Sequence, residues 1–342
     1  MNQPDLAAII LAAGQSTRMK SQLSKMLHPV CGRPIIRYVT DLAVSARRTV
    51  MVLGHQADRI QKELSDTKIE FVYQKEQLGT AHAISQTGDI LSDFSGNVLI
   101  LNGDAPLLTQ KELTELIAFH HQTQAACTIL SAHLPEPFGY GRILRDESGI
   151  VLGIIEEKDA SKKQKKIKEI NSGMYCFKAR DLYAFLNKID NRNTKKEYYL
   201  TDLIAILRQE GKLVQALKVN NYQAALGINT RMDLAEANRI MRHRILTNLM
   251  REGVTIMDPK NTYVDFGVQI GQDSLIWPGC IIEGNSCIGQ GCHIGPFSWI
   301  CQAVLMDGVY LEGGCLIRDT TLAAGLKVPA KYAGGWLETS RH

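Results

Sequence analysis

Apolar residues follow two different periods along the chain, and the first period covers residues 1–230. Short, almost continuously apolar runs alternate there with segments whose apolar residues recur at helical spacing. The runs lie at 6–11, 49–53, 69–73, 98–101 and 127–130, and the helical segments lie at 34–45, 57–64, 80–91 and 110–122. This alternation predicts an α/β domain with a mostly parallel sheet flanked by helices. Ligands of such sheets bind outside the carboxyl ends of the strands, so the loops after these runs are candidate sites.

The second period is six residues long. An aliphatic residue recurs at every sixth position from Val264 to Ile300, the register slips by one residue, and the step resumes from Leu305 to Ile317. This hexapeptide repeat predicts a parallel β-helix whose aliphatic side chains point inward. With about 18 residues in each turn, the repeat predicts about three to four coils and fades after Ile317.

A helical pattern connects the two periods. It runs from Thr230 to Gly253, and glycine commonly follows the end of a helix. We therefore expect an α/β domain at 1–229, a linker helix at 230–253, and a short β-helix with a C-terminal tail at 254–342. Inside the first domain, the basic stretch 158–168 predicts a solvated loop or lid rather than a site for polyanions.

Composition and charge narrow the function classes. The 39 basic and 35 acidic residues leave a net charge of +4, which is too balanced for general binding to nucleic acid or a membrane surface. Any anion site must therefore be local. The N-terminal residues lack the basic start of a signal peptide, and no stretch approaches the roughly 18 apolar residues of a membrane span, which predicts a cytoplasmic protein. The eight cysteines include no C-x-x-C and no zinc spacing, so we expect buried free thiols.

The loop after the first apolar run is small, polar and basic. It spans Leu11 to Lys25 and matches neither G-x-G-x-x-G nor G-x-x-x-x-G-K-[ST]. Gly14 permits a tight turn that exposes backbone N–H groups, and Arg18 and Lys25 supply two cations that suit a triphosphate. Taken alone, the segment is equally consistent with a solvated polar turn.

Two further loops carry candidate chemistry. Asp104 follows a buried run directly, where a carboxylate suits Mg²⁺, although a helix cap is the alternative. Gln74 ends another predicted strand, and its amide can pair with the edge of a base. Gly79 and Thr80 then open a helix, whose N–H groups suit a polar ligand. Without other context this last loop predicts only a structural turn.

These loops belong to an ordered set of motifs. The set is "LAAGQSTRM" followed by Lys25, then "EQLGTAHA", "NGDAPL", "GYGRI", "EEKDA", "INSGMY", "EYYLTD" and "GINTR". In this order it resembles the sugar-1-phosphate nucleotidyltransferases, and most of all the bacterial N-acetylglucosamine-1-phosphate uridylyltransferases of the bifunctional GlmU type. The resemblance covers roughly residues 5–320. It implies a Rossmann-like nucleotidyltransferase domain followed by a short left-handed parallel β-helix.

The resemblance also implies a role for individual residues. Those that would bind the nucleotide are Leu11, Ala12, Ala13, Gly14, Gln74, Gly79 and Thr80, with Gln74 and the Gly79 backbone recognising uracil. Arg18 and Lys25 would be the catalytic residues that hold the phosphates. Asp104 would bind Mg²⁺, with Asn229 as the second protein ligand. Those that would bind the sugar are Asn102, Gly103, Gly141, Glu156, Asn171 and Thr201, and Thr80 also corresponds to a residue near the amino sugar.

The implied reaction is Mg²⁺-dependent transfer of a uridylyl group from UTP to N-acetylglucosamine 1-phosphate, with release of pyrophosphate. A sugar 1-phosphate is largely dianionic near neutral pH because its second pKa is about 6, so it can attack the α-phosphorus without a general base. We accordingly interpret His28, His55 and His82 as structural. Two alternatives remain. The chain transfers a nucleotidyl group between another pair, such as dTTP or GTP with glucose or a modified hexosamine 1-phosphate, or it is a non-catalytic sugar-nucleotide sensor.

Two features depart from the family pattern. Asn102 stands where the family has tyrosine, which leaves the identity of the sugar open. The bifunctional enzymes also carry an acetyl-CoA-dependent acetyltransferase site in later coils of their β-helix, and we find no counterpart of these coils after Ile317. We therefore expect no acetyltransferase activity. The resemblance favours a homo-oligomer that assembles through the β-helix, and specifically a trimer, with a dimer or a monomer as the alternatives.

Overall fold

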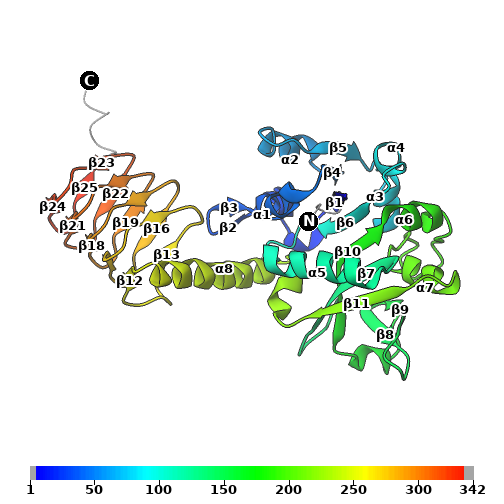
Figure 1. Ribbon diagram of the computed structural model, residues 1–342. Coiled ribbons are helices and arrows are strands. Elements are labelled where there is room, and N and C mark those ends of the chain that lie inside the picture. The colour runs from blue at the N-terminus through cyan, green and yellow to red at the C-terminus, as the bar shows by residue number, and fades with distance from the viewer. Residues whose placement is uncertain (1–4, 335–342) are drawn as a thin grey trace. The chain divides into compact units, whose positions relative to one another are not determined.

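The computed structural model describes residues 5–334 and contains two compact units (Figure 1). The first unit is Met1–His28 with Pro34–Asp233, and the second is Pro29–Arg33 with Leu234–His342. An α/β fold forms the first unit and a β-helix forms the second, as the two periods predict. The segment Pro29–Arg33 belongs to the second unit, which neither period indicates. Between residues 5 and 334, no helix has both the length and the apolar character that a membrane span requires.

A nine-stranded sheet forms the centre of the first unit, with a main path in the order β11-β7-β10-β6-β1-β4-β5. The strands of this path are β1 (Leu6–Ala12), β4 (Arg48–Leu53), β5 (Glu70–Tyr73), β6 (Asn97–Asn102), β7 (Cys127–His133), β10 (Glu169–Lys178) and β11 (Val214–Val219). β10 runs antiparallel to β6 and β7, and the other neighbours on the path are parallel. β8 (Arg142–Arg145) and β9 (Val151–Ile155) form an antiparallel hairpin beside β10. The predicted mostly parallel sheet is therefore confirmed, and the five apolar runs form β1, β4, β5, β6 and β7.

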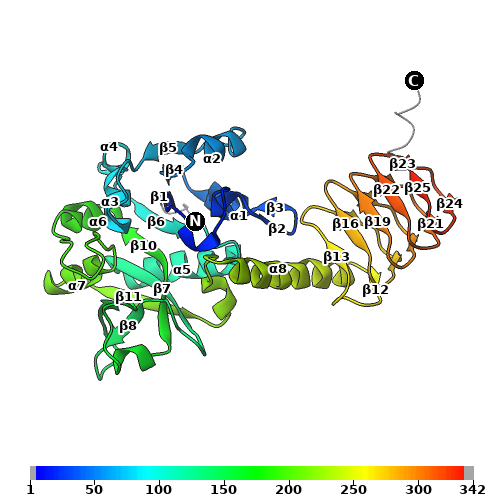
Figure 2. The same ribbon diagram turned by 180° about the vertical axis from the view of Figure 1, so that it is seen from behind.

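Helices cover both faces of the sheet (Figures 1 and 2). They are α1 (Ile35–Leu42), α2 (Ala57–Glu63), α3 (Thr80–Ser85), α4 (Gly88–Leu91), α5 (Gln110–Thr123), α6 (Ala179–Leu186) and α7 (Asp202–Gln209). Leu6, Ala8 and Ile10 of β1 belong to one core cluster, together with residues of α1, α2 and α5. Ala7 and Ile9 belong to the other, with residues of α3, α4, α6 and α7. Successive residues of a strand point to opposite faces, so a sheet covered on both faces requires the continuous apolar run.

One predicted helix is divided in the structure. The segment 80–91 forms α3 and α4, with Thr87 between them. The Thr87 hydroxyl donates to the Ile84 carbonyl oxygen at 2.6 Å, and the Thr87 backbone N–H donates to the same oxygen at 2.9 Å. A threonine hydroxyl that bonds to a nearby carbonyl competes with the helical pattern, and Gly88 next to it is a poor helix former. The apolar period alone does not show this break.

The basic stretch 158–168 is a loop with one short 3-10 helix, η4 (Gln164–Lys166), as the sequence predicts. Its lysine side chains are exposed. One of them, Lys165, lies 3.7 Å from a Glu157 carboxylate oxygen. This stretch therefore has the character of a solvated surface loop.

Helix α8 (Arg231–Arg251) agrees with the helix predicted at Thr230–Gly253, and the β-helix follows it in the chain. Its strands are β12 (Thr255–Ile256), β13 (Tyr263–Val264), β14 (Gln269–Ile270), β15 (Leu275–Ile276), β16 (Ile281–Glu283), β17 (Cys287–Ile288), β18 (His293–Ile294), β19 (Trp299–Cys301), β20 (Val304–Leu305), β21 (Tyr310–Leu311), β22 (Leu316–Arg318), β23 (Thr321–Leu322), β24 (Lys327–Val328) and β25 (Ala333–Gly334). They form three parallel sheets, as in a left-handed β-helix built from hexapeptide repeats, and successive strands of each sheet lie side by side (Figure 1).

The repeat extends further than predicted. It does not fade after Ile317, because Leu322 and Val328 are also buried inside the coil, with exposed fractions of 7% and 4%. Two of the three sheets contain five strands, which exceeds the three to four coils expected from the sequence. The reason is a second one-residue slip between Ile317 and Leu322, which breaks the strict six-residue step. The predicted C-terminal tail beyond residue 334 lies outside the described residues.

The cysteines are free thiols, as predicted, and all except Cys287 are buried. In the β-helix, the Sγ atoms of Cys280, Cys292 and Cys315 lie 3.2–3.4 Å from carbonyl oxygens of neighbouring coils. Burial raises the pKa of Cys280 and Cys292. The Cys280 and Cys292 thiols therefore fill the interior in their neutral form.

Candidate functional site

A cavity of about 540 Å³ lies at the carboxyl ends of β1 and β6 in the first unit. Leu11 comes from the end of β1, Asn102 ends β6, and Gln74 follows β5. The cavity lies where ligands of parallel sheets bind. The predicted site residues that line it are Leu11, Ala13, Gly14, Arg18, Lys25, Gln74, Gly79, Thr80, Asn102, Asp104 and Asn229.

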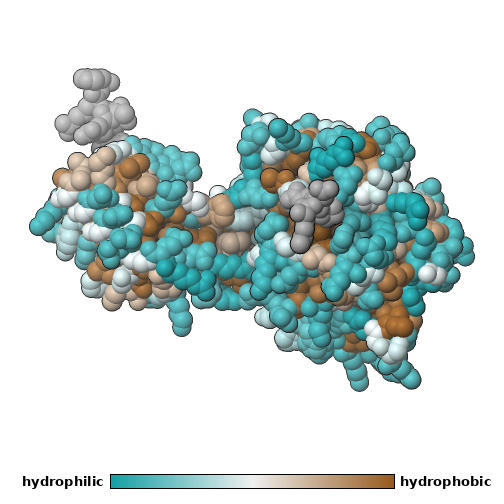
Figure 3. Space-filling view, viewed as in Figure 1, coloured by the Kyte–Doolittle hydropathy of each residue, from teal (hydrophilic) through white to brown (hydrophobic). Residues whose placement is uncertain are grey.

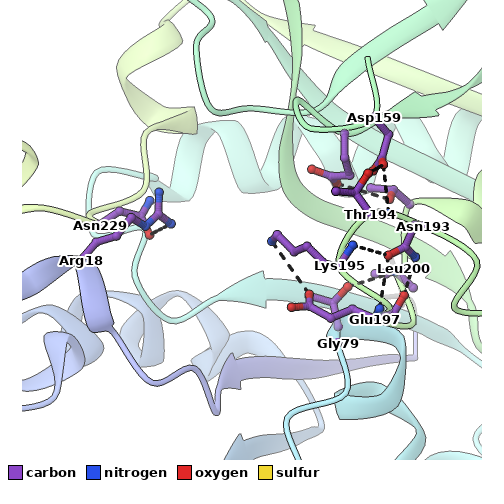
Figure 4. A network of polar contacts seen from close by, with 12 residues as sticks. Arg18, Gly79, Asp159, Asn193, Thr194, Lys195, Glu197, Leu200 and Asn229 are labelled. Atoms are coloured by element: carbon purple, nitrogen blue, oxygen red, sulfur yellow. Dashed lines mark hydrogen bonds and ion pairs between the residues drawn. The ribbon is translucent and has the colours of Figure 1, made fainter. Parts of the chain in front are cut away.

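Four of these residues form one polar cluster. The Lys25 ammonium contacts the Asp104 carboxylate, and it also donates to Asn229 Oδ1 at 3.1 Å. Arg18 Nη2 donates to the same Asn229 oxygen at 2.9 Å, and Figure 4 shows these two side chains facing each other. The fold thus brings together two cations and two oxygen donors that lie up to 211 positions apart in the chain.

The start of α8 fixes the position of Asn229. Asp233 Oδ2 accepts the backbone N–H of Asn229 at 3.0 Å and that of Thr230 at 2.8 Å. In return, the Asp233 N–H donates to Thr230 Oγ1 at 3.1 Å. This reciprocal pair is a capping box, which satisfies backbone donors at the start of a helix. Asn229 therefore sits at a backbone position that the helix start holds in place.

Asp104 and Asn229 form a suitable donor set for Mg²⁺. Mg²⁺ prefers oxygen ligands, and proteins often supply one or two of them while water and substrate phosphates complete the octahedron. Residues 5–334 contain no group of three or more His, Cys, Asp or Glu side chains that could hold a metal. The carboxylate and amide oxygens of the cluster thus fit a hard cation whose remaining ligands come from water or phosphate.

A compact loop carries Lys25 into the cavity. Lys25 begins the 3-10 helix η2 (Lys25–Leu27), and only 9% of its surface is exposed. The Gln56 side chain holds the preceding residues, because its Oε1 accepts the Ser24 N–H at 3.0 Å and its Nε2 donates to the Gln22 carbonyl at 2.6 Å. An ammonium this buried needs anionic or polar partners, which Asp104 and Asn229 provide.

On the other side of the cavity, the Gln74 amide has a defined orientation. Gln74 is buried, and its Nε2 lies 3.0 Å from both the Gly79 carbonyl oxygen and His82 Nδ1. A carbonyl oxygen only accepts hydrogen bonds, so the amide nitrogen, and not the oxygen, must face Gly79. In the His82 tautomer that carries its proton on Nε2, Nδ1 accepts the second N–H, and both N–H groups of the amide are used within the chain.

The start of α3 is less available to a ligand than predicted. The Ala81 N–H donates to the Tyr198 carbonyl at 2.9 Å, and Thr80 Oγ1 accepts the Leu200 N–H at 3.0 Å. Gly79 has a φ of +114°, and a Cβ there would lie 2.5 Å from the Tyr198 carbonyl oxygen. The glycine is therefore required for the close approach of the segment that contains Tyr198.

Two predicted site residues support the cavity wall without being part of its surface. Ala12 is buried within β1, with 1% of its surface exposed. The Gly103 N–H donates to the Leu11 carbonyl at 3.0 Å, and a Cβ on Gly103 would lie 3.0 Å from that oxygen and from Ile36 Cδ1. Neither residue is part of the cavity wall formed by the described residues. Gly103 instead lets the loop before Asp104 lie close to β1.

Four residues predicted to bind the sugar gather in a second cluster. Thr201 Oγ1 donates to Glu156 Oε1 at 3.3 Å, and the Asn171 N–H donates to the Gly141 carbonyl at 2.9 Å. Burial raises the pKa of Glu156. Among residues 5–334, this cluster is outside the cavity wall, although Thr201 follows Leu200, which is bonded to Thr80. The structure thus brings the four residues together beside the cavity but does not show them inside it.

Asn102 is tied to the backbone of β10. Its Nδ2 donates to the Ser172 carbonyl oxygen at 3.1 Å, where the register between β10 and β7 shifts. Gly173 is packed against the same side chain, since a Cβ there would lie 2.3 Å from Asn102 Nδ2. Asn102 therefore positions β10 relative to β6 as well as lining the cavity.

Sequence reasoning missed Glu197, which also lines the cavity. Asn193 shapes the loop that carries it, because Asn193 Oδ1 accepts the N–H groups of Lys195 and Glu197 at 3.2 Å, and Asn193 Nδ2 donates to the Glu197 carbonyl at 2.6 Å (Figure 4). The Lys195 ammonium lies 3.9 Å from the Glu197 carboxylate. The motif "EYYLTD" begins at this glutamate, but a charged residue in a polar loop gives no sign of its direction. The other wall residues without a predicted role are Gln15, Met26, Gln77 and Ala83.

Two known families match the two parts of the chain. The nucleotidyl transferase family matches residues 7–242, and the bacterial transferase hexapeptide family, with six repeats, matches residues 267–302.

Similar proteins come from several bacteria. The bifunctional protein GlmU of Latilactobacillus sakei is 44% identical over 311 residues, which are 90% of this chain and 67% of that protein. The protein of the same name from Syntrophotalea carbinolica is 45% identical over 322 residues, covering 94% and 69% of the two chains. The Limosilactobacillus reuteri protein is 45% identical over 311 residues, covering 90% and 68%. In each case the similarity extends through both units.

Proposed function

This chain belongs to the nucleotidyl transferase family and is a sugar-1-phosphate nucleotidyltransferase, and on that premise we propose that it makes UDP-N-acetylglucosamine and pyrophosphate from UTP and N-acetylglucosamine 1-phosphate. One observation carries the proposal. Arg18, Lys25, Asp104 and Asn229 meet in a single cavity that also contains the oriented amide of Gln74. The similarity to bifunctional GlmU proteins and the ordered motifs support this choice of substrates.

The Gln74 amide supports uracil as the base. Because Gly79 and His82 use both of its N–H groups, the atom of this amide that remains to read a base is the acceptor Oε1. Uracil carries a hydrogen on N3, whereas cytosine has a lone pair there. A fixed acceptor favours the first base and repels the second. The contact does not separate uracil from thymine, which share this edge.

The two cations supply most of the chemistry that the chain itself contributes. The sugar phosphate attacks the α-phosphorus in line, the bond to the bridging oxygen breaks, and pyrophosphate leaves. Arg18 and Lys25 would bind the triphosphate and neutralise the charge that accumulates on the departing pyrophosphate. Asp104 and Asn229 would hold Mg²⁺, which when bound neutralises phosphate charge. The reaction therefore needs positioned charges and no general base.

A matrix of nucleotides against sugar phosphates tests the proposal. Pyrophosphate release is measured with UTP, CTP, dTTP and GTP, each combined with the 1-phosphates of N-acetylglucosamine, glucosamine and glucose, in Mg²⁺ and in EDTA. We expect the highest kcat/KM for UTP with N-acetylglucosamine 1-phosphate, and turnover only with Mg²⁺. Another preferred pair would refute the substrate assignment, and binding without turnover would identify a sensor.

Asp104→Ala provides the matched test of the metal assignment. We expect the variant to lose turnover, because the single carboxylate of the donor set is removed. Asp58→Ala, in the exposed first turn of α2, is the control and should retain wild-type turnover. Wild-type kinetics of Asp104→Ala would show that the metal does not bind at this carboxylate.

The β-helix supports self-association. Tyr263, Ile281, Trp299 and Leu316 are in register on successive strands of one sheet, and the first three expose 49%, 38% and 40% of their surface. Figure 3 shows apolar residues gathered in small groups on an otherwise mostly hydrophilic face. We propose that the chain forms a homo-oligomer through the β-helix, with a trimer favoured. Sedimentation equilibrium should give that mass, and Trp299→Asp should lower it.

The predicted absence of acetyltransferase activity is tested separately. The assay follows the consumption of acetyl-CoA with glucosamine 1-phosphate as acceptor. Consumption above the background would refute that prediction and leave the proposed uridylyl transfer unaffected.

A further inference from the structure

The oxygen donors assigned to the metal are already engaged by the two cations of the site. Asn229 Oδ1 accepts one hydrogen bond from Arg18 at 2.9 Å and another from Lys25 at 3.1 Å. A carbonyl oxygen has two lone pairs, so this acceptor is fully used. Because Arg and Lys only donate, the amide cannot be oriented the other way. Asn229 therefore cannot ligate a metal until at least one cation leaves.

Asp104 is engaged by the same ammonium. The Lys25 Nζ lies against Asp104 Oδ2 and within hydrogen-bond distance of Asn229 Oδ1, so it occupies the place between the two donors. Both partners are largely buried, with side-chain exposures of 11% for Lys25 and 17% for Asp104. Water therefore does not readily replace either partner.

The charges of the cavity wall also disfavour binding of a metal ion without nucleotide. Among the described residues that form the wall, Arg18 and Lys25 are cationic, and Asp104 and Glu197 are anionic. These charges balance without a ligand. A divalent cation that entered alone would add two positive charges next to Lys25 and Arg18, whereas a triphosphate would bring the anionic oxygens that draw these side chains away.

We infer that Lys25 and the divalent cation compete for Asp104 and Asn229, and that the nucleotide must bind first to release this pair. The inference rests on the proposed function, since it takes a nucleoside triphosphate as the ligand that moves Lys25. Lys25 then has two partners in sequence. It holds the metal donors in the free protein and the phosphates in the complex. Binding of nucleotide and of metal is accordingly cooperative, and the coupling is reciprocal.

Mn²⁺ binding to the full chain without nucleotide tests the competition. The free Mn²⁺ is followed by its electron paramagnetic resonance signal, in wild type and in Lys25→Met, which keeps most of the length of the side chain but removes its charge. We expect Mn²⁺ to bind at least about tenfold more tightly to Lys25→Met than to wild type. Lys20→Met is the matched control, because Lys20 is an exposed lysine of the same loop, and it should bind Mn²⁺ as wild type does.

A double variant and a replacement variant complete the test of the competition. Adding Asp104→Ala to Lys25→Met should remove the gain, which locates the ion at this carboxylate. If thermal melting shows that Lys25→Met does not fold, Lys25→Gln replaces it in the same titration. Equal or weaker Mn²⁺ binding in the folded variant overturns the inference.

The result is independent of the proposed reaction. Pyrophosphate release by wild type together with unchanged Mn²⁺ affinity in Lys25→Met would refute the competition and leave the function standing. Tighter Mn²⁺ binding in the variant, without turnover by wild type on any pair, would refute the function and leave the competition standing.

Discussion

Asp233 is not among the described residues that line the cavity, yet we predict that Asp233→Ala raises the Mg²⁺ concentration that the reaction requires. The change removes the acceptor of the Asn229 and Thr230 N–H groups, which lie 3.0 and 2.8 Å from Asp233 Oδ2. It leaves the second half of the capping box, because residue 233 can still donate its N–H to Thr230 Oγ1. The backbone of Asn229 thereby loses one of the contacts that fix its position.

The size of the effect follows from these two bonds. A helix cap contributes about 1 kcal/mol, and a hydrogen bond to a charged group contributes about 1.5–3 kcal/mol when it is buried. Water reaches this half-buried helix start, so we expect a loss of about 1–2 kcal/mol in the free energy of unfolding. For a unit of this size that lowers the melting midpoint by about 2–8 °C. Partners behind a metal ligand typically alter metal affinity by about 10–100-fold, so the Mg²⁺ concentration for half-maximal rate should rise about tenfold.

Asp146→Ala is the matched control. Its Oδ1 also accepts two backbone N–H groups, those of Ser148 and Ile150, at 3.0 and 2.9 Å, but in a turn outside the cavity wall. Melting curves and Mg²⁺ titrations of pyrophosphate release are measured for both variants. We expect only Asp233→Ala to require more Mg²⁺. An equal Mg²⁺ requirement in the two variants would refute the reasoning that the capping box positions the metal ligand.

Three further predictions follow from other parts of the structure. Gln74→Leu should reduce the preference for UTP over CTP, measured as the ratio of kcat/KM, by about tenfold or more, since it removes the acceptor that reads N3. Leu322→Ala should lower the unfolding free energy of the β-helix by about 2–5 kcal/mol in urea, whereas Leu326→Ala, 42% exposed, should change it by less than about 0.5 kcal/mol. Burial, and then neighbouring carboxylates, raise the pKa of Asp202 from 3.8 to about 6, so the unfolded chain releases this proton first and stability falls as pH rises through that interval. Asp202→Asn should reduce that fall in melting curves between pH 4 and 6, and an unchanged profile would contradict the assignment.

The fold was predictable because the side chains that are buried determine which positions along the chain are apolar. Strands covered on both faces gave continuous runs, as in β1, and the inward positions of the β-helix gave the six-residue step. Apolar spacing does not predict a helix break made by one side chain, and a one-residue slip interrupts the six-residue step. Thr87 divides a helix without changing its apolar face, and the slip before Leu322 hides a coil that is nonetheless buried.

Part of the site was predictable because the loops that follow parallel strands lie at the same edge of the sheet. Arg18, Lys25, Asp104 and Gln74 follow strands and do meet in the cavity. The sequence did not show how they are oriented, because contacts such as Gln74 with His82 depend on packing rather than on residue type. The capping box is visible in the sequence as Thr230 and Asp233 at the start of a helical pattern, and independently of the family motif it indicates that Asn229 lies at a fixed helix start.

These contacts together explain how the site can be ordered before any substrate binds. The backbone of Asn229 is held from one side by Asp233, and its carbonyl is held from the other side by Arg18 and Lys25. In the proposed complex, phosphate oxygens would take the two cations and the metal would take the oxygens of Asp104 and Asn229. In the proposed order, Asp104 is unpaired only after the nucleotide draws Lys25 away and before the metal binds, so the penalty of an unpaired buried ion favours metal entry at that point. On the proposed mechanism, the donors would therefore require little reorganisation when the α-phosphorus is attacked, which is the condition under which fixed charges accelerate a reaction most.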